Sequence, residues 1–228
     1  MLALIVISFL VAAIAVLGFM RRARRHARRY GKDMPQRFHA GHVPRLGGAG
    51  IFLGMGAAWL AAGVIDQVNV YWPLKASGLT LLCLAPAVFG GILEDVTQRV
   101  AVRWRLGLTI GSAVLLCYVL DLSLERTGVP WVDGWLRAIP YASMLFAAFA
   151  IGGLPHAFNI IDGYNGLAGT VAVLVCLAIS HVALQLGDRQ LAAMVLCLLG
   201  ATAGFLMWNY PRGKIFAGDG GAYVWGMV

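Results

Sequence analysis

Seven long runs of apolar residues alternate with short polar segments along the chain. They cover residues 1–20, 47–65, 74–93, 106–122, 138–158, 166–186 and 190–208. Each run has close to the roughly 20 residues that a helix needs to cross a hydrocarbon layer about 30 Å thick, and the runs hold almost no internal charge. The pattern predicts an all-α fold, a polytopic membrane helical bundle with seven spans.

The two ends of the sequence each add one expectation. No basic residue precedes the first run and its arginines follow it, which is the reverse of a signal peptide, so we interpret it as a retained span. After Asp219 the sequence reads GGAYVWGMV, the start of an eighth span that is too short to cross a bilayer. We therefore expect a single transmembrane domain over residues 1–228 that is incomplete at its C-terminus.

Basic residues gather in alternate loops and predict the orientation. The loops after the first, third and seventh runs hold 14 of the 18 Lys and Arg residues, nine of them from Arg21 to Arg45. By the positive-inside rule this side is cytoplasmic and the N-terminus lies outside. Residues 21–46 are then a basic cytoplasmic loop. We interpret its RRARRHARRY run as an anchor at the lipid headgroups rather than a nucleic-acid site, and it could also attract an anionic substrate.

The composition agrees with a membrane protein and excludes other classes. Apolar residues make up 60% of the chain and charged residues 12%, about half of the roughly 25% usual in soluble domains. These values exclude intrinsic disorder and a disulfide scaffold. The cysteines lie inside the apolar runs and are interpreted as small buried hydrophobic residues: Cys83, Cys117, Cys176 and Cys197.

Four polar clusters fall on the side assigned to the cytoplasm, and the first is RFHAGHVPRLGG at 37–48. Its Pro44 and paired glycines precede the second span. His39 and Arg45 in this cluster could bind a phosphate group of a substrate. The alternative is an ordinary entry into a helix, with basic residues that face the lipid headgroups.

The second cluster, GGILEDVTQRVAVRWRL at 90–106, places Glu94 and Asp95 at the end of the third span. Adjacent carboxylates at a membrane edge repel each other unless a cation or a basic partner is near. Neighbours on a helix point in different directions, so one could hold a metal while the other reaches a substrate. The alternative is a helix-end pair neutralised by Arg99 or Arg103.

The third cluster is HAFNIIDGYNGLAG at 156–169. Asn159 and Asp162 are three residues apart and share a face if this segment is helical, and Asn165 would extend that stripe. Such polar side chains are costly in so apolar a neighbourhood unless they are used. The segment carries no Lys or Arg that could pair with Asp162.

The fourth cluster, KIFAGDGGAY at 214–223, surrounds Asp219 with glycines. A carboxylate beside bare backbone N–H groups suits a divalent cation and a phosphate, and a plain turn is the alternative. The carboxylates and amides of these clusters offer oxygen ligands, which favour Mg²⁺ or Mn²⁺ over zinc. The sequence shows no zinc-type Cys/His spacing, no Ser/His/Asp grouping and no Walker-type loop.

The motifs PRLGG, GILEDV, NIIDGYNGLAG and FAGDGG occur in this order over residues 39–228. This combination resembles the polyprenyl-phosphate N-acetylhexosamine-1-phosphate transferases of glycosyl transferase family 4, which include phospho-N-acetylmuramoyl-pentapeptide transferase and undecaprenyl-phosphate N-acetylglucosaminyl-1-phosphate transferase. The resemblance implies a Mg²⁺-dependent enzyme of the bacterial inner membrane with its active site on the cytoplasmic face. It would transfer N-acetylhexosamine-1-phosphate from a UDP-sugar to undecaprenyl phosphate, release UMP and initiate a lipid-linked cell-envelope glycan. HVPRLGG and NGLAG favour the O-antigen type, and a homodimer is compatible with this function.

The resemblance also implies roles for individual residues. Asp95 and Asp219 match metal-associated acids, and Glu94 stands where the family has the first Asp of a pair, the base for the lipid phosphate. Asp162 would be catalytic and would lie near the nucleotide with Asn159 and Asn165, the last of which replaces an Asp. The family continues with further spans and a loop that contains His, which this sequence lacks.

Two alternatives stay open at this point. The chain could be an inactive, truncated member of the family. It could also be a transporter, since polar residues within the membrane mark ion paths, but a transporter predicts them at mid-bilayer depth rather than at one edge.

Overall fold

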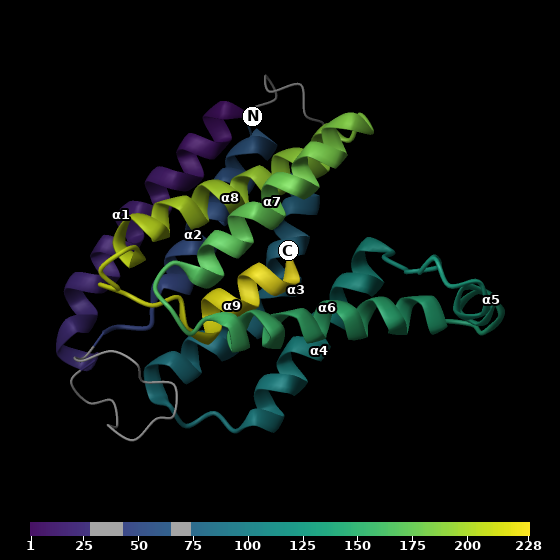
Figure 1. The fold of residues 1–228 in the computed structure, drawn as a ribbon, viewed down its shortest axis with the longest axis horizontal. Coiled ribbons are helices and arrows are strands. Elements are labelled where there is room, and N and C mark those ends of the chain that lie inside the picture. The colour runs from purple at the N-terminus through teal and green to yellow at the C-terminus, as the bar shows by residue number, and fades with distance from the viewer. Residues whose placement is uncertain (28–42, 65–73) are drawn as a thin grey trace.

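The computed structural model describes residues 1–27, 43–64 and 74–228, and within these ranges the regular structure is helical (Figure 1). The helices are α1 (Leu2–Ala27), α2 (Gly47–Val64), α3 (Leu74–Thr97), α4 (Val102–Leu120), α5 (Pro130–Ala138), α6 (Ala142–Ile161), α7 (Leu167–Gln185), α8 (Arg189–Asn209) and α9 (Gly218–Met227). Seven helices of the described ranges, all except α5 and α9, are long and apolar enough to cross a membrane. The predicted all-α bundle of seven spans is confirmed.

The helix boundaries differ from the apolar runs where polar residues continue a helix beyond the membrane. α4 begins at Val102, before the run expected to start at 106. Its first turn contains arginines, which interrupt an apolar run but are compatible with a helix. α6 begins at Ala142 rather than 138. The interval between them contains α5, a short amphipathic helix that the span pattern did not predict. Hydropathy marks the part of a helix that contacts lipid, and it does not mark where the helix ends.

The helices form two groups with α9 between them (Figure 1). α1, α2 and α8 pack against one another and α7 packs on α8, whereas α4 packs on α3 and α6. α9 contacts α2, α3 and α6, and most of its residues are buried. This short C-terminal helix therefore links the two groups, and its first turn lies where several polar segments meet.

Backbone hydrogen bonds join the first and fourth polar clusters. The N–H groups of Gly47 and Gly48 donate to the carbonyls of Phe216 and Ala217, each at 2.9 Å, and the N–H of Phe216 donates to the carbonyl of Pro44 at 2.8 Å. These bonds satisfy N–H groups in the first turn of α2 and backbone groups just before α9, where no helical partner exists. They hold the entry of α2 against the entry of α9.

Candidate functional site

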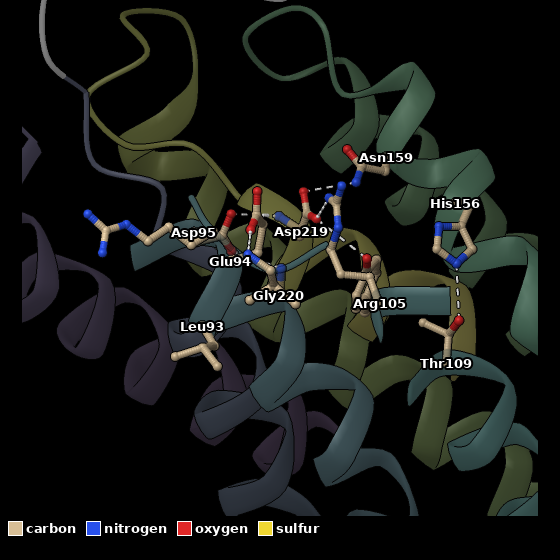
Figure 2. Close-up of polar contacts among 12 residues, drawn as sticks. Leu93, Glu94, Asp95, Arg105, Thr109, His156, Asn159, Asp219 and Gly220 are labelled. Carbon is tan, nitrogen blue, oxygen red and sulfur yellow. Dashed lines mark hydrogen bonds and ion pairs between the residues drawn. The ribbon is translucent and has the colours of Figure 1, made fainter. Parts of the chain in front are cut away.

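The N-terminus of α9 is fixed to the end of α3 by Asp95. The two carboxylate oxygens of Asp95 each accept one backbone N–H, from Asp219 and from Gly220, both at 2.9 Å (Figure 2). The first N–H groups of a helix have no partner within the helix and favour a negative charge, so a buried carboxylate is stabilised there. Asp95 is 2% exposed, and it positions the first turn of α9.

Two glycines make this close contact between helices sterically feasible. Gly218 has a φ of +71°, a conformation that side chains with a Cβ rarely adopt. A Cβ added at Gly91 of α3 would lie 2.7 Å from the backbone nitrogen of Gly220. Larger residues at either position would push α9 away from Asp95.

Asp219, in the first turn of α9, collects polar partners from other helices. Arg105 at the start of α4 forms an ion pair and hydrogen bond with its Oδ2, and Asn159 near the end of α6 donates from Nδ2 to its Oδ1 at 2.9 Å (Figure 2). The hydroxyl of Tyr223 donates to Oδ2 at 3.4 Å. The second, third and fourth polar clusters therefore meet at one buried carboxylate.

A cavity of about 60 Å³ opens beside this carboxylate. Its lining combines charged, amide and backbone groups from the first, third and fourth clusters: Arg45, Asn159, Asp162, Gly163, Tyr164, Phe216, Gly218 and Asp219. A space of this size holds a few water molecules or a partly hydrated ion. The polar residues converge on the cavity from separate parts of the sequence, as expected of a binding site.

Asp162 has a perturbed acidity at the edge of this cavity. The pKa of its carboxyl is raised to about 6, mainly by burial; the positive charge of Arg45 opposes this rise and the nearby charge of Asp219 adds to it. The basic partner absent from the segment around Asp162 is thus supplied by the first cluster. A carboxylate whose ionisation is costly gains most from a cation or a donor-rich ligand.

Two other predicted site residues have different surroundings. Glu94 accepts a hydrogen bond from the backbone N–H of Val100 at 2.7 Å, at the exit of α3. Asn165 does not continue the helical stripe of Asn159 and Asp162, because α6 ends at Ile161. Its Nδ2 instead donates to the carbonyl of Pro211 at 3.1 Å. His39 lies outside the described residues, as does most of the loop 21–46.

Besides Tyr223, three residues of this region were not among the predicted site residues. Arg105 had counted only toward the charge of its loop, although it is the side chain that pairs with Asp219. His156 lies 3.0 Å from the hydroxyl of Thr109 through its Nε2 (Figure 2), and its ring meets that of Tyr223 edge-on. The signals in the sequence were a histidine and an arginine near span ends, and neither residue type identifies the partner that it contacts.

Asn209, the third of these residues, joins two loops. Its Oδ1 accepts the N–H of Gly166 at 2.6 Å, and its Nδ2 donates to the carbonyl of Ile215 at 2.8 Å. The segment that carries Asp162 is thereby tied to the segment that leads to Asp219. Asn209 directly follows a predicted apolar run and is the last residue of α8, where a buried amide is costly unless both its groups are bonded.

The donor set of the cavity fits a hard divalent cation in type. Asp162 and Asp219 both line the cavity, and Asn159 adds an amide. Mg²⁺ is commonly bound by one or two carboxylates together with waters and substrate phosphates. In the described part of the chain no group of three His, Cys, Asp or Glu side chains could hold a metal alone. The residues therefore fit a cation that is shared with a phosphate ligand.

The fold and the site together define a class: a multi-pass membrane protein with a polar, carboxylate-lined cavity where its spans end. Residues 77–228 match the family model described as Glycosyl transferase family 4. The match covers about two thirds of the sequence, and the chain belongs to this family. The resemblance found in the four motifs is confirmed.

Curated relatives show what the chain is similar to. It is 30% identical over 230 residues to the "Probable undecaprenyl-phosphate N-acetylglucosaminyl 1-phosphate transferase" of Bacillus subtilis (strain 168), with 97% of this chain and 60% of that protein covered. It is 28% identical over 236 residues to the phospho-N-acetylmuramoyl-pentapeptide-transferase of Clostridium perfringens (strain SM101 / Type A), with 97% and 70% covered. The enzyme of that name from Moorella thermoacetica is 27% identical. The chain thus spans 60% of the length of the first relative and about 70% of the others.

Proposed function

We propose that this chain contributes the site for transfer of a sugar-1-phosphate, of the N-acetylhexosamine type, from a UDP-sugar to undecaprenyl phosphate. The observation that supports this most is the convergence of Arg105, Asn159 and Tyr223 on the buried Asp219, beside a cavity that also receives Arg45 and Asp162. Phosphoryl transfer depends on positioning and on the electrostatic stabilisation of phosphate oxygens, and these residues supply both signs of charge. Family membership and the names of the relatives support the same reaction.

The reaction exchanges one phosphorus–oxygen bond for another. An oxygen of the lipid phosphate attacks the sugar-bearing phosphorus of the UDP-sugar, the bond from that phosphorus to the bridging oxygen breaks, and UMP leaves with the electron pair. A site at the span ends allows a water-soluble donor and a lipid acceptor to meet. The 14 basic residues on one side support the assignment of this edge to the cytoplasmic face of a bacterial inner membrane.

Each side chain then has a distinct task. Arg45 and Arg105 place positive charge beside the diphosphate, and Asn159 keeps the carboxylate of Asp219 directed to the cavity. Glu94 is the proposed base for the lipid phosphate. Asp219 and Asp162 would hold Mg²⁺ or Mn²⁺, and Asp95 would keep the first turn of α9 in place behind them. The bound cation would neutralise negative charge on the diphosphate.

The direct test measures transfer of label from a radioactive UDP-sugar to undecaprenyl phosphate in membranes that contain the chain, with Mg²⁺ or with EDTA. The proposal expects labelled lipid with Mg²⁺, loss of the signal with EDTA, and loss in Asp219→Asn. Asp133→Asn, which changes a carboxylate far from the cavity, is the matched control. Binding of the UDP-sugar by the purified chain with no transfer would contradict the proposal and identify the inactive alternative.

A further inference from the structure

The short helix α5 lies at the end of the molecule opposite to the candidate site. α4 begins next to the site with Arg105 and ends at Leu120, and α6 runs back from Ala142 to the site at Asn159. α5 connects the far ends of these two spans (Figure 1). It therefore sits where two membrane-spanning helices leave the bilayer, on the side away from the cavity.

α5 has one side that is buried against the protein and one side that is largely exposed. Asp133 and Leu136 are buried, whereas Trp131 and Trp135 are 78% and 54% exposed. The two tryptophans are four residues apart and lie on the same side of the helix. The carboxylate of Asp133 accepts hydrogen bonds from the backbone N–H and the hydroxyl of Thr127 at 2.6 and 2.7 Å, so the preceding loop fixes which side points out.

Exposed aromatic residues at the ends of α4 bracket an apolar band. Trp104 is 63% exposed near the site, and Tyr118 is 78% exposed near the far end. Fourteen residues of helix separate them by about 21 Å. The exposed residues between them include Leu106, Ile110 and Leu115. Trp and Tyr concentrate at the two water–lipid boundaries of membrane proteins, so Tyr118 marks the boundary next to α5.

The aromatic side of α5 continues this boundary. Tyr141, directly before α6, is also exposed, so the tryptophans of α5 lie in sequence between two exposed tyrosines at span ends. Arg126 and Arg137 border the hollow between α5 and the preceding loop. Guanidinium groups at this position match the phosphates of lipid headgroups in charge and geometry.

We propose that α5 is an interfacial helix whose tryptophan side inserts into the phospholipid headgroup region on the side opposite to the candidate site, with Arg126 and Arg137 against lipid phosphates. The bilayer is the occupant that the positions of α4 and α6 require, because α4 ends ten residues before α5 and α6 begins four residues after it. An aromatic side with basic residues at its border is the composition of helices that lie in the interface. The helix would fix the depth and tilt of α4 and α6, which carry Arg105 and Asn159.

The test places a spin label on α5 in liposomes of phosphatidylethanolamine and phosphatidylglycerol. Trp131→Cys and Trp135→Cys are labelled separately, and Glu125→Cys in the preceding loop is the matched control. The chain without an added cysteine, treated with the same spin label, controls for the native cysteines, which are buried. Relaxation by oxygen, which concentrates in lipid, is compared with relaxation by a water-soluble nickel complex.

The proposal expects the oxygen effect to exceed the nickel effect about threefold or more for both α5 labels, and the reverse ratio for Glu125→Cys. A dominant nickel effect at both positions would place the helix in water and overturn the proposal. Protection from both agents would show that a protein partner or a second copy covers α5, and would also overturn it. If the cysteine variants fail to assemble, quenching of tryptophan fluorescence by lipids brominated near the headgroup distinguishes the outcomes. The quenching should be weaker in the double variant Trp131→Phe/Trp135→Phe than in the unchanged chain. Equal quenching in the two proteins would overturn the proposal.

Discussion

Two buried carboxylates lie at opposite ends of the pair of spans α4 and α6, one in α5 and one in α9. Their hydrogen-bond partners come from different distances along the sequence. Asp133 at the α5 end and Asp219 at the cavity end are both 8% exposed. Asp133 takes its hydrogen bonds from Thr127, six residues away in sequence. Asp219 takes its partners from Arg105 and Asn159, which are 114 and 60 residues away.

This difference separates a local structural role from a site. The contacts of Asp133 can form as soon as its own loop closes, and they lower the pKa of its carboxyl. The contacts of Asp219 exist only after four helices have assembled, and they partly bury a guanidinium and an amide at a cost in desolvation. Costly groups gathered from distant segments beside a cavity indicate a function that needs them there.

The largest expected effect separates the two carboxylates by activity. Asp219→Asn should reduce sugar-phosphate transfer by about 10³-fold or more, because it removes a charge at the centre of the site. Asp133→Asn should leave transfer within about twofold and lower the apparent melting temperature, because it weakens a charge-assisted contact that holds a loop. Initial rates and thermal unfolding in detergent measure both. Equal losses of transfer in the two variants would remove the distinction.

Asp162→Asn is expected to have the next largest effect. The amide keeps the shape and the hydrogen-bonding capacity of the side chain, so expression and membrane insertion should be normal. Transfer should fall about 10²-fold, a loss of roughly 3 kcal/mol in transition-state stabilisation. A variant that misfolds, or one that transfers normally, would assign Asp162 to packing.

A smaller effect on transfer is expected when Arg105, the partner of Asp219, is replaced by another positively charged residue. Arg105→Lys keeps a cation at the start of α4 but loses the planar group that also fits phosphate, so transfer should fall about tenfold. Arg103→Lys is the matched control and should retain its rate of transfer, because Arg103 lies two residues from Arg105 and makes no contact with Asp219. Steady-state rates at several donor concentrations show whether the loss is in kcat or in KM. A full rate in Arg105→Lys would show that charge alone is needed.

The smallest effect concerns stability and pH. Burial raises the pKa of Asp162 from 3.8 to about 6, so its ionisation opposes folding. That cost is nearly absent at pH 4, grows between about pH 4 and pH 6, and is complete above this window. Asp162→Asn should therefore melt a few degrees above the unchanged chain at pH 7.5, and the gain should shrink as the pH falls toward 4. A gain independent of pH would contradict the assigned acidity.

The sequence alone was enough to predict the seven spans and the family, because the apolar runs and the four motifs are encoded locally. About 20 apolar residues in succession have one stable arrangement in lipid, a helix, because no water is present to satisfy the backbone. The family followed from the order of the motifs, and the cavity lining includes Arg45, Asn159, Asp162 and Asp219 as expected. Each of these residues could be identified by its type and its position at a span end.

Only the tertiary structure decided which groups meet. Asp95 binds the first turn of α9, Arg105 pairs with Asp219, Asn165 turns to the loop after α8, and Asn209 joins two loops. The periodicity of a segment determines which of its residues share a face, but it holds no information about which other helix that face will contact. Those choices depend on the packing of glycine-lined helices around α9, where Gly91 and Gly218 allow the backbones to approach. Long-range packing therefore converts residues that are recognisable one by one into a single site.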